Sequence, residues 1–166
     1  MKNINNIDDL ITAIHDPNYY SVASETGKFT NCEFPKDSTA TFNDDSVQNA
    51  LNGINQIQFN AGVKFTMKAS TLFSNCSYLT DITFLTTELN FDYDDESDTW
   101  NLDEAFYNCQ SLEWVKFYEK PTNIEKLVSM NYIFANCTSL KRTTFDNIIF
   151  YASGLKSAQY AFTNTD

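Results

Sequence analysis

LFSNCSYLTDITF, residues 72–84, is the most informative stretch of the sequence, because the chain repeats its pattern as AFYNCQSLEWVKF at 105–117 and as IFANCTSLKRTTF at 133–145. In each copy an aromatic residue lies three positions before a Cys, a Leu three positions after it, and a Phe five positions after that Leu. The repeat positions are Phe73, Cys76, Leu79, Phe84, Phe106, Cys109, Leu112, Phe117, Phe134, Cys137, Leu140 and Phe145. One such unit cannot bury its own apolar face, so the repeat predicts a stack in which neighbouring units cover one another.

Two weaker copies flank the clear ones. Residues 54–59 keep the strand pattern without the Cys, and residues 160–165 keep the aromatic start with Thr in place of Cys. The closing Phe residues are separated by 25, 33 and 28 positions, from Phe59 through Phe84 and Phe117 to Phe145. This variation is typical of a fixed core with loops of variable length.

Two periodicities alternate within a unit. Apolar and polar residues alternate at 57–59, 82–84 and 115–117, which predicts short strands, and a second short extended piece follows at 63–65, 89–91 and 148–150. Before each Cys, apolar residues recur at steps of three and four, as in 127–134, which predicts a short helix. Each helix would end at the Asn before the Cys, because Asn tolerates the left-handed conformation of helix C-termini.

The copy Ala105-Phe106-x-x-Cys109-x-Ser111-Leu112 resembles the BspA-like leucine-rich repeats, and the resemblance covers about residues 50–166. It implies an α/β fold, a leucine-rich-repeat-like solenoid of short strands and short helices. Members of that family include surface adhesins, lipoprotein arrays and parts of phage particles, so the resemblance implies the fold much more than the function.

Residues 1–49 match the repeat poorly and are expected to form an N-terminal cap on the solenoid of residues 50–166, the whole being one compact unit. Ile4, Ile7, Leu10, Ile11 and Ile14 lie on one face of an expected amphipathic helix that ends near Pro17. That helix either covers the first unit or docks on a partner. Residues 19–23 and 29–34 are expected to form a hairpin, and FTNCEF at 29–34 is either a diverged first rung or part of the cap, the reading we prefer.

Composition narrows the function. The 166 residues are 42% hydrophobic with a net charge of −11, which favours one folded domain and argues against binding nucleic acid or an anionic membrane. No apolar run is long enough to span a membrane, and no secretory signal is evident at the N-terminus. On these grounds the virion or the cytoplasm is expected rather than Sec-dependent secretion.

The repeated Cys residues are expected to be buried, reduced and structural, because they share one repeat position and lack the close spacing of zinc ligands. The single His, His15, has no spacing that ties it to a Cys, so no catalytic residue, cofactor or metal is predicted. The acidic segment 92–98 is read as a solvated insertion. The alternative is a calcium loop, although the segment lacks the Gly that such loops use.

Two functions are therefore expected of a non-enzymatic module. The first is an accessory subunit of a larger assembly, such as a phage virion, that pairs with other subunits or with itself through the C-terminal end of the solenoid. The second is an adhesin that binds a protein or a glycan through its sheet. On the sheet, Thr83, Lys116 and Thr144 are expected in one register, with Asp81, Trp114 and Arg142 two residues before them. The candidate partner surface comprises Trp114, Lys116, Arg142, Phe150 and Tyr151.

Overall fold

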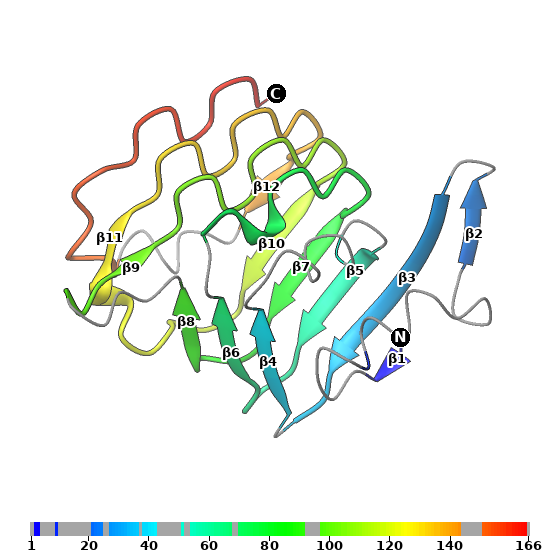
Figure 1. Ribbon diagram of the computed structural model, residues 1–166, viewed down its shortest axis with the longest axis horizontal. Helices are drawn as coiled ribbons and strands as arrows, with labels where there is room; N and C mark the ends of the chain where they lie inside the picture. The colour runs from blue at the N-terminus through cyan, green and yellow to red at the C-terminus, as the bar shows by residue number, and fades with distance from the viewer. Residues whose placement is uncertain are drawn as a thin grey trace.

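Short parallel strands from successive repeats dominate the computed structural model (Figure 1), which describes residues 2–3, 9, 21–24, 27–36, 38–42, 51, 54–67, 70–91, 97–143 and 151–165. The strands are β1 (Lys2–Asn3), β2 (Ser21–Ser24), β3 (Gly27–Phe34), β4 (Thr39–Phe42), β5 (Ile54–Phe59), β6 (Lys64–Met67), β7 (Asp81–Phe84), β8 (Leu89–Phe91), β9 (Trp100–Asn101), β10 (Trp114–Phe117), β11 (Leu127–Ser129) and β12 (Arg142–Thr143). Two 3-10 helices, η2 (Ser70–Phe73) and η3 (Ile124–Lys126), interrupt them.

The main sheet collects one strand from each repeat. Its order is β1-β3-β5-β7-β10-β12, all parallel, and β2 pairs antiparallel with β3. Phe59 pairs with Phe84 and Phe84 with Phe117, so the closing Phe of each repeat keeps one register. Side chains alternate between the two faces of a strand, and this register therefore places Phe59, Phe84 and Phe117 on the same, inner face.

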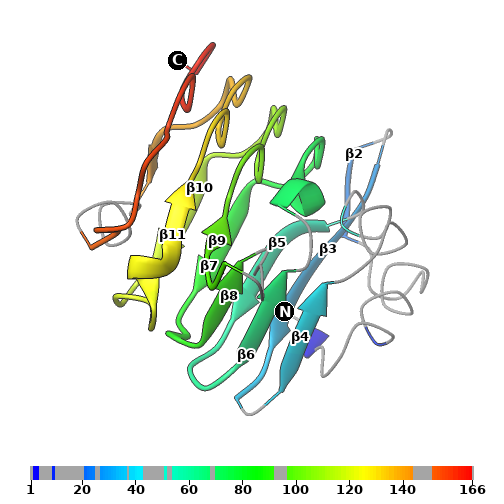
Figure 2. The same cartoon turned by 60° about the vertical axis from the view of Figure 1, so that its left-hand side comes forward.

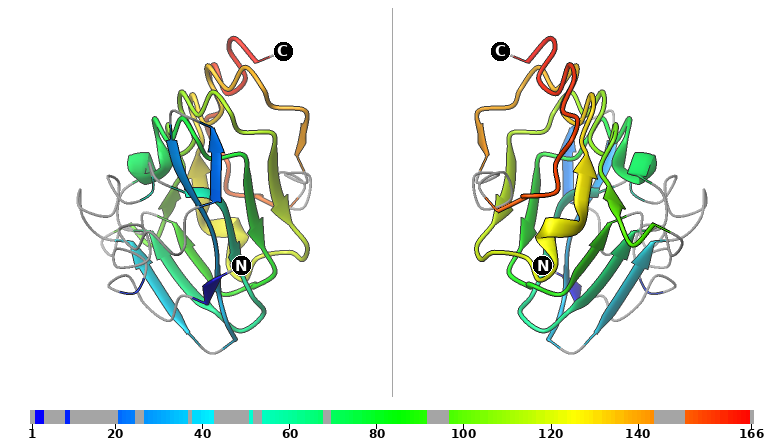
Figure 3. Two further views of the ribbon diagram at one scale, coloured as in Figure 1. Left: turned by 90° about the vertical axis from the view of Figure 1, so that its right-hand side faces the viewer. Right: turned by 90° about the vertical axis from the view of Figure 1, so that its left-hand side faces the viewer.

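The remaining strands form two smaller sheets. The second sheet has the order β4-β6-β8, and the third pairs β9 with β11 and continues as a bridge between Ser129 and Ser157. Figure 3 shows the main sheet and the second sheet on different sides of the stack, and Figure 2 shows β9 and β11 side by side. The core lies between these sheets.

A column of stacked rings fills the core behind the main sheet. Phe34, Phe59, Phe84 and Phe117 stack in sequence with ring centroids 5.1, 5.0 and 4.7 Å apart. Each of these rings is fully buried or nearly so. The spacing follows that of hydrogen-bonded strands, about 4.8 Å, because each repeat contributes one strand and one ring. All repeat positions that the structure describes are buried, whereas Phe145 lies outside the described residues.

Three of the segments before or around the repeat Cys position, predicted as helices, are runs of turns instead. They stack on one another, and we call them the turn ladder: residues 102–109, 130–137 and 158–165. Within a run, backbone N–H groups donate three residues back, as from Cys109 to Phe106 O at 3.2 Å. Every second N–H instead donates to the next repeat: Phe106 to Ile133 O at 2.9 Å and Asn108 to Ala135 O at 2.8 Å. These bonds replace the i to i−4 bonds of a helix.

Left-handed residues enforce the turns. Asn75, Asn108 and Asn136, each just before a repeat Cys, have φ of 60°, 57° and 62°. Left-handed residues also occur four positions before two of them, at Glu104 and Tyr132. A right-handed helix does not pass through two such residues in one run. Asn side chains then link neighbouring repeats, with Asn108 Nδ2 donating to Asn75 Oδ1 at 2.9 Å.

The predicted fold class, an α/β leucine-rich-repeat-like solenoid with a short helix in each repeat, is therefore wrong. Among the described residues of 54–165 the helical elements are the two 3-10 segments, and the strands form small sheets rather than the closed coils of a solenoid. The expected left-handed Asn before each Cys is confirmed. The amphipathic helix expected over 4–14 lies almost wholly outside the described residues.

The N-terminal hairpin is confirmed as β2 and β3, but β3 does more than cap the stack. Its residues 31–34 pair in parallel with 56–59 of β5, and Phe34 stacks on Phe59. The preferred reading of FTNCEF as part of a cap is replaced by the alternative, a first rung of the main sheet.

The relative stabilities of the Gly and Ala variants at Asn108 distinguish a left-handed turn from a helix. We expect Asn108→Gly to be more stable than Asn108→Ala by about 1 kcal/mol, because a Cβ is strained at positive φ. In a helix the order reverses, since Gly costs about 1 kcal/mol relative to Ala. Urea unfolding of both variants measures the difference. Ser77, which is exposed and has no positive φ, is the control position: there the Ala variant should be at least as stable as the Gly variant.

Candidate functional site

The outer face of the main sheet carries ordered rows of polar and aromatic side chains. In β7 and β10 alternate residues are buried and partly exposed. The register places Gln56 beside Asp81, Asp81 beside Trp114, and Trp114 beside Arg142, while the next row runs from Gln58 through Thr83 to Lys116. The registers predicted for Thr83 with Lys116, and for Asp81 with Trp114 and Arg142, are confirmed, and Thr144 lies outside the described residues.

Asp81 contacts three neighbouring polar side chains. Its Oδ2 accepts hydrogen bonds from Gln56 Nε2 at 3.2 Å and from Thr80 Oγ1 at 2.8 Å. Its Oδ1 lies 3.9 Å from Lys116 Nζ, a contact that crosses from one row to the other. Because both side chains of this ion pair remain partly exposed, water screens the attraction, and the pair orients the groups more than it stabilises the fold.

Lys116 also lies against Trp114. Its Nζ is 5.3 Å from the centroid of the Trp114 ring, within the range of a cation–π contact. Trp114 itself is only half-buried. The ammonium group thus lies near both a carboxylate of the neighbouring strand and an aromatic ring of its own strand.

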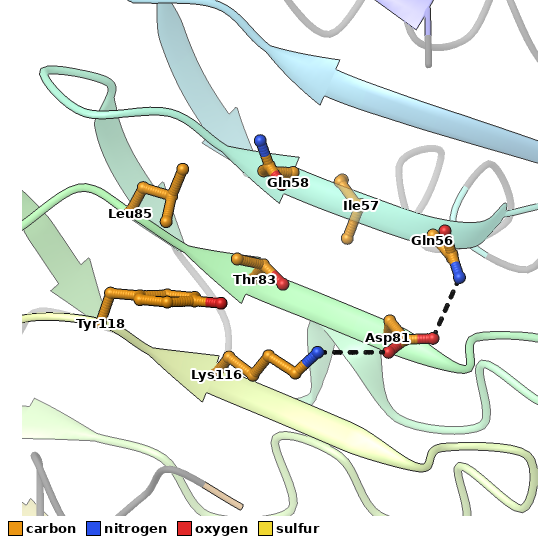
Figure 4. A pocket seen from close by; sticks show the side chains of 8 residues that line it. All are labelled: Gln56, Ile57, Gln58, Asp81, Thr83, Leu85, Lys116 and Tyr118. Carbon is orange, nitrogen blue, oxygen red and sulfur yellow. Dashed lines mark hydrogen bonds and ion pairs between the residues drawn. The ribbon is translucent and has the colours of Figure 1, made fainter.

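A hollow of about 440 Å³ lies over β5, β7 and β10. Figure 4 shows Leu85 and Tyr118 at one end, Gln56 and Asp81 at the other, and Gln58, Thr83 and Lys116 between them. Gln58 is held by its own hydrogen bond, Nε2 to Asn60 Oδ1 at 2.7 Å. Tyr118 is 63% exposed, so its ring is open to contact from solvent.

The candidate partner surface is divided by the structure. Trp114 and Lys116 lie on the outer face, and Arg142 pairs with Trp114 through the backbone of β12. Phe150 lies outside the described residues. Tyr151 is 49% exposed, and Lys120 Nζ lies 4.9 Å from its ring centroid; neither residue is among those that line the hollow.

Sequence reasoning missed four of the residues that line the hollow. Gln56 and Gln58 belong to the copy without a Cys, yet they occupy the repeat positions of Asp81 and Thr83, a signal that alignment of the copies contains. Leu85 and Tyr118 each directly follow the closing Phe of a repeat, which is the corresponding signal at the other end.

The repeat Cys residues are buried rather than part of this face. Cys109 Sγ donates to Phe73 O at 2.9 Å and Cys137 Sγ to Phe106 O at 3.0 Å, so each thiol joins its repeat to the preceding one. Burial raises the pKa of Cys109 well above its usual value and raises the pKa of Cys137 from 9.0 to about 12, with the neighbouring thiols adding to both shifts. Thiols held in this protonated form are poor nucleophiles.

The acidic segment 92–98 is described only at its end. There, Asp98 Oδ1 accepts from Lys126 Nζ at 2.7 Å, so this carboxylate is already engaged by a cation. Among the described residues no cluster of three or more His, Cys, Asp or Glu side chains is placed to hold a metal ion. No helix in the described part of the chain has the length and apolarity needed to cross a bilayer.

Comparison with protein-family models, curated proteins and solved structures finds no match to this chain. The resemblance to the BspA-like repeats therefore rests on the repeat residues alone.

The raised pKa of Cys137 predicts a pH-dependent contribution to stability. The folded thiol titrates near 12 and the unfolded thiol near 9, so its contribution is complete below pH 9 and declines as pH rises toward 12. We expect the stability advantage of the native chain over Cys137→Ala to shrink by up to ~1.4 kcal/mol per pH unit in that window. Urea unfolding from pH 7 to 11 measures it; an advantage that stays constant over this range would contradict the burial argument.

Proposed function

We propose that this chain is a non-catalytic recognition module that binds its partner through the outer face of the main sheet. The observation that carries the proposal is the hollow over three neighbouring strands, in which a buttressed lysine, a carboxylate, two amides and an open tyrosine ring converge. Concave sites with a few fixed polar groups are typical of binding sites. Trp114, beside Lys116, also offers an aromatic side chain of the kind that dominates binding energy at interfaces.

Two further observations support recognition rather than chemistry or nucleic-acid binding. The buried thiols are protonated and point into the core, so they do not serve as nucleophiles at the face. The net charge of −11 opposes the phosphate contacts on which nucleic-acid affinity depends.

A structural subunit of a larger assembly, such as a virion, is the second candidate. It is favoured by an exposed aromatic pair on the turn ladder: the rings of Tyr132 and Tyr160 stack with centroids 5.1 Å apart. Tyrosine is enriched at protein interfaces because it combines a large apolar ring with a hydrogen-bonding end. In this role the partner is another protein subunit, and the contact lies on the turn ladder rather than on the sheet.

Matched face variants decide between the two candidates. The outer-face variant is Trp114→Ala with Lys116→Ser, and the turn-ladder variant is Tyr132→Ser with Tyr160→Ser; Lys116→Glu alone leaves Trp114 in place if the double variant fails to fold. Each immobilised chain is incubated with extract of the encoding organism, and the retained proteins and glycans are quantified by mass spectrometry. We expect the outer-face variant to retain about tenfold less partner than the native chain, because hot-spot residues carry most of the affinity.

The turn-ladder variant serves as the control in that experiment. Loss of the partner in this variant alone would favour the assembly candidate, and equal retention by all chains would contradict both. Circular dichroism spectra that match the native chain establish that each variant is folded.

A further inference from the structure

We propose that the hollow on the outer face binds a neutral glycan, with its sugar rings lying across β5, β7 and β10. The inference rests on the proposed recognition function and names the chemical class of the ligand. It is drawn from the charge of the hollow, the hydrogen-bonding groups that line it, the aromatic ring at its end and the spacing of its strands.

Charge indicates an uncharged ligand. The hollow contains one carboxylate, Asp81, and one ammonium group, Lys116, and the two lie 3.9 Å apart. Each therefore largely neutralises the other toward a ligand above them. The chain as a whole carries a net charge of −11, which repels polyanions. An anionic glycan is disfavoured for this reason, and a neutral one is not.

The polar lining matches a ligand rich in hydroxyl groups. Gln56 and Gln58 carry amides that both donate and accept, and Thr83 and Tyr118 carry hydroxyls that do the same. A sugar hydroxyl needs both kinds of partner at once. Asp81 and Lys116 add a strong acceptor and a strong donor to the same row. Within the described residues, no hydrogen bond engages the hydroxyl of Thr83 or Tyr118, so both hydroxyls are available to a ligand.

The aromatic end and the strand spacing supply the shape. Tyr118 and Leu85 form the apolar end of the hollow (Figure 4), where an open ring face can cover the C–H face of a pyranose. Neighbouring strands repeat at about 4.8 Å, close to the length of one sugar residue in an extended glycan. Rings placed across successive strands would each meet the outward side chains of one repeat.

A peptide fits this face less well. Extended peptides gain most of their affinity by adding a strand at a sheet edge, where backbone groups are unpaired. The hollow lies over strands in the middle of the sheet, and the backbones of β5, β7 and β10 are already paired with one another. A peptide there would leave its own backbone groups dependent on a few side chains.

Residue-resolved titration tests the inference on the complete chain. The probes are cellotetraose, maltotetraose, chitotetraose and mannotetraose at millimolar concentration, with a heparin tetrasaccharide and a capped serine–glycine tetrapeptide as comparisons. Backbone amide shifts are followed by two-dimensional NMR. We expect at least one neutral tetrasaccharide to shift the amides of β5, β7 and β10, including Thr83 and Lys116.

Two variants and one control locate the contact. Tyr118→Ala should weaken that binding about tenfold, because it removes the ring that covers the C–H face of the sugar. Thr83→Val, which keeps the side-chain shape, should weaken it measurably. Tyr160→Ala removes an equally exposed tyrosine from the turn ladder and should leave it unchanged.

Several outcomes would overturn the inference: no shift with any neutral tetrasaccharide, shifts confined to another face, or equal weakening by Tyr118→Ala and Tyr160→Ala. Binding of the tetrapeptide or of heparin in the hollow would also overturn it while leaving the recognition function in place. If the outer-face variant of the extract experiment retains its partner as well as the native chain does, the recognition function itself fails.

Discussion

Backbone hydrogen bonds between successive repeats hold both the strands and the turns of this structure in register. In the main sheet they hold strands of neighbouring repeats in register, and in the turn ladder every second N–H of residues 102–109 and 130–137 donates to a carbonyl of the next repeat. Because the strands are in register, equivalent side chains of successive repeats lie directly above one another in the core. The stacked rings follow from that constraint: they belong to Phe34, Phe59, Phe84 and Phe117. Each ring pair stabilises the contact between two strands that backbone hydrogen bonds already join.

The same constraint explains the residues around the core. The thiols of Cys109 and Cys137 reach the carbonyl of a Phe one repeat earlier, which a shorter apolar side chain such as Ala does not do. Asn108 accepts the left-handed conformation and still donates its amide to Asn75, so it serves the turn and the stack together. On the outer face, the repeat register brings side chains from distant positions into rows, and the hollow is a consequence of which side chains those rows contain.

The strands and their register could be predicted from the sequence, because a period of two and a closing Phe are direct signals of β-structure. The helices could not be distinguished from turns: Leu102, Ala105, Phe106 and Cys109 all face the core, and two consecutive turns place them inward at the same three- and four-residue steps as a helix. The residue that distinguishes turns from a helix is the Asn before each Cys. The sequence pattern indicates the end of a helix at this Asn, whereas in the structure it belongs to a run of turns. For the hollow, the rows of Asp81 with Trp114 and of Thr83 with Lys116 were predictable, whereas Tyr118 and Leu85 lie beyond the strand pattern and depend on how the chain leaves the sheet.

Hydrogen bonds between repeats, rather than helical bonds within them, hold the turn ladder together. Scalar coupling across hydrogen bonds in a uniformly ¹³C,¹⁵N-labelled chain measures this directly, because it identifies the carbonyl that each amide contacts. The account predicts a coupling between the amide nitrogen of Phe106 and the carbonyl carbon of Ile133. A coupling from Phe106 to the carbonyl of Leu102, the i to i−4 partner of an α-helix, would contradict it.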